Sequence, residues 1–557
     1  MSNPLLSRDT LPTCGLTKKA SLNMLHSITY VCSKVKIQCC SIIGEGRLMS
    51  TIYIDGNSLN LEKIEEVAHK RTPIALTEAC IQKVNKCRDY VEKIIDKGEL
   101  VYGLNTGFGK LSSIAIPRDN IAELQVNLIR SHSTSVGPAY TVEQTRAIML
   151  LRINVLAKGH SGVRLETLQT LVDMLNKGVH PIIPMRGSVG ASGDLSPLSH
   201  LALTLIGEGE AEFEGEIISG AEAMQRAGIK PVQLQAKEGL ALNNGTQVMT
   251  ALGVLNLLEA ERLCKYADII AACTIDAMKG TPSAFDSLVH KLRPHKGQIA
   301  SASNISNLMN NSPLRESHLN CENVQDPYSL RCTPQVHGAV RDAIDYVRGV
   351  LEVEINSATD NPLIFPDEEK VISGGNFHGE PLAICLDTLA LAISELASIS
   401  ERRIEQMLNP ALNRGLTPFL AKNPGIDSGY MIVQLTAASL VSENRVLAHP
   451  ACVDNIPTSA NQEDFVSMGS VSANKLIQVV ENVRTVLAIE LMVAAQALDQ
   501  RNIPSSSVLE KVKSSFRQIV PTLQEDRITY PDINAAVNFL KKSTLLELVQ
   551  TEGINLY

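Results

Sequence analysis

The chain has 557 residues, 44% of them hydrophobic, and a formal net charge of −8. A mildly negative chain without a basic run offers little to nucleic acid or to an anionic membrane surface, so we expect neither as a partner. No uncharged apolar stretch reaches bilayer length, and the 12 cysteines lack zinc-type paired spacing. We therefore expect reduced thiols in a cytoplasmic protein.

The first 48 residues differ in composition from the rest of the chain. They hold six basic residues and only two acids, together with several serines and four cysteines. Such a composition occurs in transit peptides, but the amphipathic arginine periodicity of those peptides is missing. We predict a disordered N-terminal extension over 1–48 and one folded domain over 49–557.

Helical periodicity covers most of the remaining chain, and short β elements are expected near its N-terminus at 51–56 and 207–220. The segments 281–313, 356–365 and 373–380 are predicted to be loops. This pattern predicts a mainly α protein in which very long helices pack side by side. The expected helices are 61–68, 77–97, 118–132, 142–158, 165–178, 195–203, 247–278, 335–355, 381–408, 430–448, 466–500 and 506–517.

An Ala-Ser-Gly tripeptide at 191–193 directly precedes one of these helices. Ser196 is expected to cap the helix and Pro197 to fit its first turn. The tripeptide would then lie in the positive field of a helix N-terminus. A serine-hydrolase elbow is excluded, because Asp194 stands where that motif requires glycine.

Two interpretations of the tripeptide remain open from its residues alone. It is either a turn of small residues or the precursor of an electrophile. In the second case the amide nitrogen of Gly193 attacks the carbonyl carbon of Ala191, where the missing Cβ permits close approach. Loss of one water closes the ring, and loss of a second from Ser192 gives 4-methylidene-imidazol-5-one.

Three further stretches carry polar groups in unusual settings. Tyr102 lies in a glycine-rich loop that cannot be a phosphate loop, since Leu111 follows its Gly-Lys pair. An Asn-Gly turn is expected to present the amide of Asn244. Tyr328 and Arg331 share a helical face, which suits a carboxylate. Each has a plain structural alternative, such as a packing tyrosine or a surface arginine.

Taken together and in this order, these stretches resemble the aromatic amino acid lyase family from about Met49 to the C-terminus. The motif stretches are 102–109, 187–198, 238–246, 325–335, 374–380 and 458–468. The resemblance implies a long-helix bundle of the fumarase/aspartase-like type and a homotetramer. It also implies a prosthetic group made from Ala191, Ser192 and Gly193, with no external cofactor and no metal.

The resemblance also assigns roles to individual residues. Tyr102 and Tyr328 are implied to be the proton-handling phenols, with Tyr102 favoured as the base and Tyr328 as the alternative. The base must be ionised, so its pKa must fall below ~10. The other implied roles are a carboxylate clamp (Arg331, Asn244), groups that border and orient the ring (Gln325, Phe377), and groups around the side chain of the substrate (His132, Met431, Glu463), of which Glu463 also counts as catalytic.

For the reaction, the resemblance implies non-oxidative deamination of L-histidine to trans-urocanate and ammonia, the first step of histidine degradation. Glu463 suits an imidazole N–H, whereas family members that act on phenylalanine or tyrosine generally carry an amide there. Phe465 departs from the pattern, since the histidine type carries histidine at that position. Tyrosine or phenylalanine ammonia-lyase, a 2,3-aminomutase and a catalytically silent scaffold remain alternatives.

The helices between 381 and 500 are apolar over more than one face, as at 389–396 and 486–493. A surface helix needs only one apolar stripe, so the additional faces predict partner subunits. We expect Ser192 and Tyr102 to come from one chain, and Tyr328, Arg331 and Glu463 to come from its neighbours.

Overall fold

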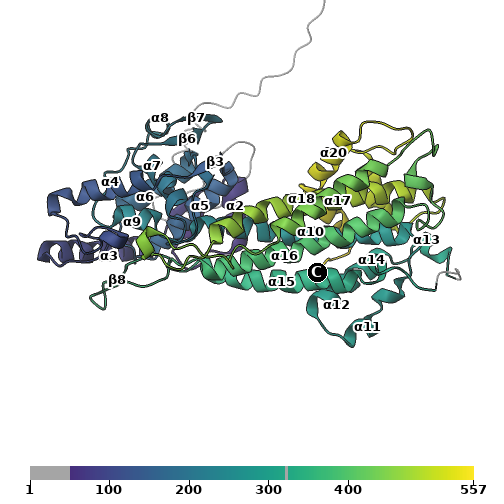
Figure 1. Ribbon diagram of the computed structural model, residues 1–557, viewed down its shortest axis with the longest axis horizontal. Helices are drawn as coiled ribbons and strands as arrows, with labels where there is room; N and C mark the ends of the chain where they lie inside the picture. Colours follow the sequence, from purple (N-terminus) through teal and green to yellow (C-terminus); the bar gives the residue numbers. More distant parts are fainter. Residues whose placement is uncertain (1–50, 320–323) are drawn as a thin grey trace, which may run out of the picture. The chain divides into compact units, whose positions relative to one another are not determined.

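Five long helices run side by side and form the frame of the protein (Figure 1). The computed structural model describes residues 51–319 and 324–557, so the predicted extension at 1–48 lies outside the described residues. The prediction of a mainly helical bundle is confirmed. The five helices are α10 (Gln247–Ala277), α15 (Thr333–Glu354), α16 (Glu380–Leu408), α17 (Met431–Leu447) and α18 (Gly469–Gln500).

The centre of the bundle is formed by α10, α16 and α18, which are buried over most of their length. By length and composition α16 could cross a membrane, but 72% of its most apolar window is buried inside the protein. The apolar run 486–493, which we expected to need a partner subunit, is fully buried within its own chain. That part of the argument for a partner is therefore wrong, because α10, α16, α17 and α20 (Tyr530–Leu540) already surround α18.

Shorter helices and small sheets precede the bundle in the chain. The predicted strand near residue 52 and the predicted hairpin at 207–220 are both present. The helices are α2 (Leu61–Lys70), α3 (Glu78–Lys97), α4 (Ile121–His132), α5 (Val142–Ala157), α6 (Leu165–Lys177), α7 (Leu195–Leu205), α8 (Gly220–Arg226) and α9 (Glu238–Asn243). The paired strands are β1 (Ile52–Ile54) with β2 (Ile74–Leu76), β3 (Val136–Ala139) with β5 (Pro184–Arg186), and β4 (His180–Pro181) with β6 (Glu210–Phe213) and β7 (Glu216–Ser219).

The segment 281–313 is largely helical, so its prediction as a loop is wrong. It contains α11 (Ser287–Lys291), α12 (Lys296–Leu308) and the start of α13 (Pro313–Glu316). A Cβ on Gly297 would lie 2.2 Å from the carbonyl oxygen of Gly338, so α12 crosses α15 at backbone contact distance. The remaining elements are α14 (Tyr328–Arg331), β8 (Leu363–Phe365), β9 (Lys370–Ile372), α19 (Ser507–Arg517) and α21 (Thr544–Thr551).

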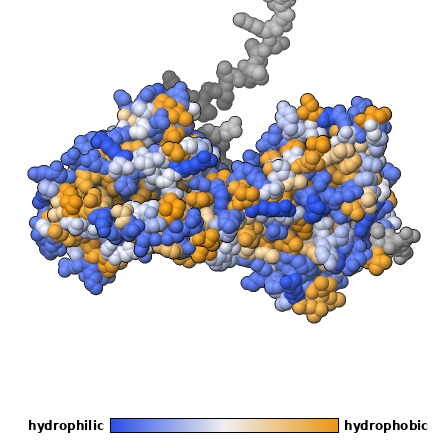
Figure 2. Space-filling view, viewed as in Figure 1, coloured by the Kyte–Doolittle hydropathy of each residue, from blue (hydrophilic) through white to orange (hydrophobic). Residues whose placement is uncertain are grey.

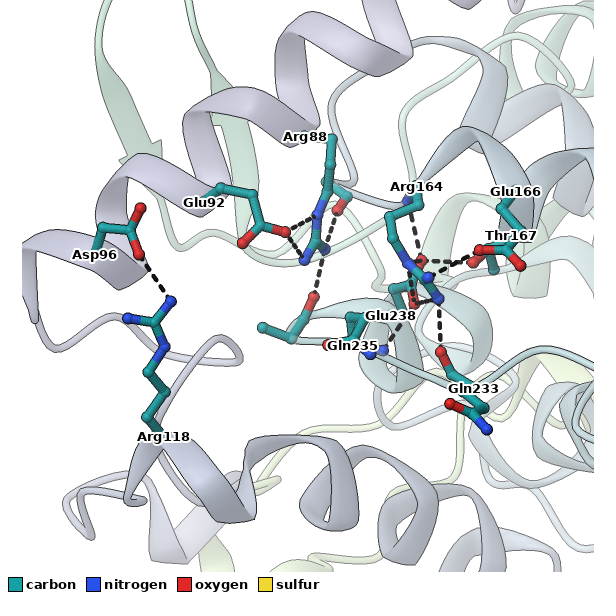
Figure 3. A network of polar contacts seen from close by, with 12 residues as sticks. Arg88, Glu92, Asp96, Arg118, Arg164, Glu166, Thr167, Gln233, Gln235 and Glu238 are labelled. Atoms are coloured by element: carbon teal, nitrogen blue, oxygen red, sulfur yellow. Dashed lines mark hydrogen bonds and ion pairs between the residues drawn. The ribbon is translucent and has the colours of Figure 1, made fainter.

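A buried carboxylate anchors the segment that leads into α9 and α10. Glu238 accepts hydrogen bonds from the guanidinium of Arg164, the hydroxyl of Thr167 at 2.5 Å and the backbone N–H of Gln235 at 2.8 Å (Figure 3). Its charge is balanced by Arg164, as a fully buried carboxylate requires. These contacts fix the start of α9, and the chain after α9 enters the candidate site.

Candidate active site

The tripeptide 191–193 lies directly before α7, as predicted, but the helix begins differently. Asp194 occupies the capping position, and Ser196 lies inside the helix. Ser196 contacts the backbone N–H of Thr134 at 3.1 Å and the hydroxyl of Ser135 at 2.8 Å. The predicted Ser196 cap is therefore wrong, because tertiary partners occupy its hydroxyl.

Asp194 joins α7 to the N-termini of two other helices. Its carboxylate accepts from the N–H groups of Val248 and Met249, at 2.9 and 3.0 Å, in the first turn of α10. The hydroxyl of Ser470, in the first turn of α18, donates to it at 2.8 Å. Burial raises the pKa of Asp194 to about 6, although these hydrogen bonds oppose the shift. Three helix N-termini thus meet beside the tripeptide, with the Asp194 carboxylate bound between them.

The backbone of the tripeptide is tightly enclosed. Gly193 has φ +71°, and a Cβ there would lie 2.2 Å from the carbonyl oxygen of Gly245. The backbone N–H of Asp194 donates to that same oxygen at 2.7 Å. Within the described part of the chain, neither the N–H of Gly193 nor the carbonyl oxygen of Ala191 has a hydrogen-bond partner. The two backbone groups that ring closure would join are therefore free, so the residues fit an imidazolone precursor.

A cavity of about 930 Å³ opens above Ser192. It brings together six of the residues predicted to form the site, from segments far apart in the sequence. The side chain of Ser192 donates to Oε1 of Glu463 at 3.3 Å. Glu463 therefore belongs to the same chain as Ser192, and our expectation that a neighbour supplies it is wrong. The six residues are Tyr102, His132, Ser192, Asn244, Phe377 and Glu463.

Tyr102 lies at the wall of this cavity, and its hydroxyl accepts from the N–H of Gly109 at 3.3 Å. Burial raises the pKa of Tyr102, and the charge of Glu463 raises it further, while the Gly109 bond lowers it. This direction is opposite to the one that a base requires. The described chain alone therefore does not supply the positive charge that would ionise this phenol.

His132 and Asn244 both line the cavity. Nδ1 of His132 lies 3.0 Å from the hydroxyl of Ser131, and burial lowers the pKa of His132, which favours a neutral ring. The amide nitrogen of Asn244 donates to the carbonyl of Asn361 at 3.0 Å. Its buried Oδ1 has no partner among the described residues. A buried amide oxygen without a partner is costly, and this one belongs to a residue that lines the cavity.

Three predicted residues form a second cluster that the cavity does not include. The guanidinium of Arg331 lies 4.6 Å from the ring centre of Tyr328, and its Nε donates to the carbonyl of Asp326 at 3.0 Å. When the Gln325 amide is oriented with its oxygen toward Arg331, that oxygen accepts two hydrogen bonds, at 3.1 and 3.2 Å. The predicted shared face of Tyr328 and Arg331 is confirmed. The side chain of Tyr328 is 71% exposed.

The length of α10 separates this cluster from the cavity. The helix begins beside Asp194 and ends just before Thr281, whose N–H donates to Asp326 at 2.7 Å. Its 31 residues span about 46 Å at 1.5 Å per residue. Met431 is also absent from the cavity lining and lies at the first residue of α17. One chain thus presents two incomplete groups of polar residues at opposite ends of its bundle.

Sequence reasoning missed the groups that hold Glu463. Its Oε2 accepts from the hydroxyls of Thr458 and Ser459 at 2.7 and 2.8 Å. The available signal was the pair of hydroxyl residues five and four positions before Glu463. Phe465, by contrast, does not line the cavity; it is 60% exposed and stacks on His378 at 6.1 Å between ring centres.

The fold and the cavity define a helical-bundle protein. Where the N-termini of its helices meet, it holds an Ala-Ser-Gly tripeptide whose backbone groups are free to cyclise. The chain belongs to the aromatic amino acid lyase family, whose model matches residues 59–518. It is 52% identical, over 91% of its length and 100% of the relative, to a histidine ammonia-lyase of Caldanaerobacter subterraneus subsp. tengcongensis.

Solved structures with this fold include enzymes of two reaction types. The crystal structure of histidine ammonia-lyase from Trypanosoma cruzi has a TM-score of 0.84 and 43% identity, and the match covers 90% of this chain and 95% of that one. A tyrosine aminomutase from Streptomyces globisporus has a TM-score of 0.86 and 38% identity, covering 91% and 100%. The fold alone therefore does not distinguish lyase from mutase.

Proposed function

We propose that this protein is a histidine ammonia-lyase, which converts L-histidine to trans-urocanate and ammonia. The observation that carries the proposal is Glu463 beside Ser192, with His132 on the same cavity. A carboxylate accepts a hydrogen bond from an imidazole N–H, and a neutral histidine provides a second polar contact to the ring. The identity to histidine ammonia-lyases over nine tenths of the chain supports the same substrate.

We propose that Ala191, Ser192 and Gly193 form 4-methylidene-imidazol-5-one without an external cofactor. The enclosed loop supports this, because it presses Gly193 against Gly245 and leaves the two groups that must join without other bonds. The group, once formed, supplies an electrophile that turns the substrate amine into a better leaving group. The N-termini of α7, α10 and α18 stabilise negative charge that develops there.

The side chains of the cavity bind and orient the substrate and move one proton. The amide N–H of Asn244 and the guanidinium of Arg331 from another subunit donate to the carboxylate of the substrate, while Glu463 and His132 hold its imidazole and Phe377 borders it. A tyrosine then removes the β-proton; we favour Tyr102, with Tyr328 as the alternative. Since burial raises the pKa of Tyr102, the base needs a nearby cation, and Arg331 of another subunit is the candidate.

This arrangement requires subunits to share sites, and we propose a homotetramer. Tyr328, Arg331, Gln325 and Met431 lie too far from Ser192 to act on it within one chain. They would complete the cavity of a neighbour, which matches the exposed position of Tyr328.

A 2,3-aminomutase is the second candidate, because the tyrosine aminomutase structure matches this fold equally well. Incubation with L-histidine, followed by ultraviolet absorption of urocanate and by detection of free ammonia, tests the proposal. We expect equal amounts of both products. Formation of a β-amino acid, or faster turnover of tyrosine or phenylalanine than of histidine, would contradict it.

A further inference from the structure

The two oxygens of the Glu463 carboxylate have different neighbours. Oε2 accepts two hydrogen bonds, from Thr458 Oγ1 at 2.7 Å and from Ser459 Oγ at 2.8 Å. Oε1 faces the cavity and, among the residues that the structure describes, accepts only from Ser192 Oγ, at 3.3 Å. One oxygen is therefore held by the loop and the other is directed toward the position where the substrate reacts.

The loop that makes these contacts has an unusual backbone. Two hydrogen bonds between the backbones of Thr458 and Glu463, at 2.8 and 3.3 Å, close it at its base. Between them Ser459, Ala460 and Asn461 have φ values of +50°, +53° and +63°. Three successive non-glycine residues in the left-handed region are unfavourable and persist only where the surroundings impose them. This turn brings the hydroxyl of Ser459 back to the carboxylate.

We propose that Thr458 and Ser459 are positioning residues that fix Glu463 through Oε2 and present Oε1 to the ring of the substrate. The proposal rests on the proposed function, because it assumes that Glu463 receives the imidazole N–H. Two donors on one oxygen prevent the carboxylate from rotating about its terminal torsion, so the lone pairs of Oε1 point in one direction. If Ser192 loses its hydroxyl as water, Oε1 becomes free for that contact.

Removal of the hydroxyls at nearly constant shape tests the proposal. Thr458→Val and Ser459→Ala should each lower kcat/KM for L-histidine roughly tenfold, and the double variant about 100-fold, as expected for charge-assisted hydrogen bonds. Thr458→Ser, which keeps the hydroxyl, should restore activity. In a Ser192→Ala background the substrate is not consumed, and calorimetry should show L-histidine binding weakened by a similar factor.

A background without the carboxylate provides the matched control. In Glu463→Ala the hydroxyls have nothing to hold, so the same changes should alter kcat/KM and affinity less than about twofold. Equal losses in both backgrounds, or a loss that follows the melting temperature, would overturn the positioning role.

The proposed function is tested separately, by turnover of L-histidine in the unaltered protein. If that protein prefers tyrosine or phenylalanine, the function fails, and the same comparison of backgrounds is made with the preferred amino acid. Binding of none of the three would overturn both proposals.

Discussion

Ser192 is the residue on which the proposed chemistry depends, and its modification can be measured directly. The peptide that spans 191–193 should have a mass lower by two waters, whereas Ser192→Ala should lack this loss and be nearly inactive. Gly193→Ala should also prevent it, because the new Cβ would lie 2.2 Å from the Gly245 oxygen and the glycine has φ +71°. An unmodified peptide from fully active protein would contradict the prediction.

Substrate recognition can also be tested at a single residue, Glu463. In Glu463→Gln the side chain loses its negative charge and one acceptor oxygen becomes a donor amide, so the imidazole N–H loses a charged acceptor. We expect kcat/KM for L-histidine to fall by about 100-fold or more, because a polar site rejects a ligand that leaves its groups unpaired. The melting temperature should change little, since Glu463 is only half-buried. Unchanged turnover of L-histidine would contradict the role.

Asp268 links three helices and gives the fold a defined response to acid. On α10, it accepts from Ser301 and Asn304 of α12 at 2.7 and 2.9 Å, and from His337 and Arg341 of α15 at 2.8 and 2.7 Å. Burial alone would raise the pKa of Asp268, but Arg341 and His337 hold it at about 2. The carboxylate therefore stabilises the packing of these helices only while it is ionised.

The sign of the pH effect follows from this lowered pKa. The ordinary value is 3.8, so the stabilisation is present above about pH 4 and is lost as the pH falls toward 2. A shift of nearly two units corresponds to about 2 kcal/mol of unfolding free energy. Denaturant unfolding at pH 7, 4 and 2.5 should show this loss in the unaltered protein, and Asp268→Asn should lose that part of the pH dependence. The same pH dependence in the variant would contradict the assignment.

The long elements could be predicted from sequence because their apolar periodicity is strong, as the bounds of α10, α16 and α18 confirm. The prediction failed at α12, whose glycine, serine and asparagine residues have low helix propensity. There the close crossing of Gly297 over Gly338 stabilises the helix through tertiary packing, which a local pattern does not contain. The predicted Ser196 cap of α7 was wrong for the same reason, since partners distant in sequence occupy the hydroxyl of Ser196.

The sequence indicated which residues belong to the candidate site, but it did not indicate how they are arranged. Motif stretches identified Ser192, Tyr102 and Glu463, and the structure places all three on one cavity. The motifs could not indicate that Glu463 belongs to the same chain as Ser192, because loop 458–465 is brought to the tripeptide by tertiary contacts, such as the bond from Ser470 at the start of α18 to Asp194. They also gave no sign that burial raises the pKa of Tyr102.

At the scale of the whole molecule, exposed apolar side chains support assembly. Figure 2 shows hydrophobic residues gathered in patches on the face in view. On the bundle helices several large apolar side chains are exposed although their helices are otherwise packed, and apolar groups of this kind mark an interface where they form one contiguous patch. They are Ile384 and Leu391 of α16, Ile432, Leu435 and Val446 of α17, and Val471 of α18. Within the apolar stretch 389–396, which we expected to face a partner, Leu391 is exposed and the other apolar side chains are buried.

If sites are shared, two inactive variants should complement each other. A Ser192→Ala chain keeps Arg331, and an Arg331→Ala chain keeps Ser192. The two residues lie at opposite ends of a helix about 46 Å long, so each must meet its counterpart on another chain. In randomly mixed oligomers about one quarter of the sites inherit both residues, so co-expression should restore up to that fraction of activity. Sedimentation should show four chains. An active monomer, or mixed oligomers without recovered activity, would contradict the shared site.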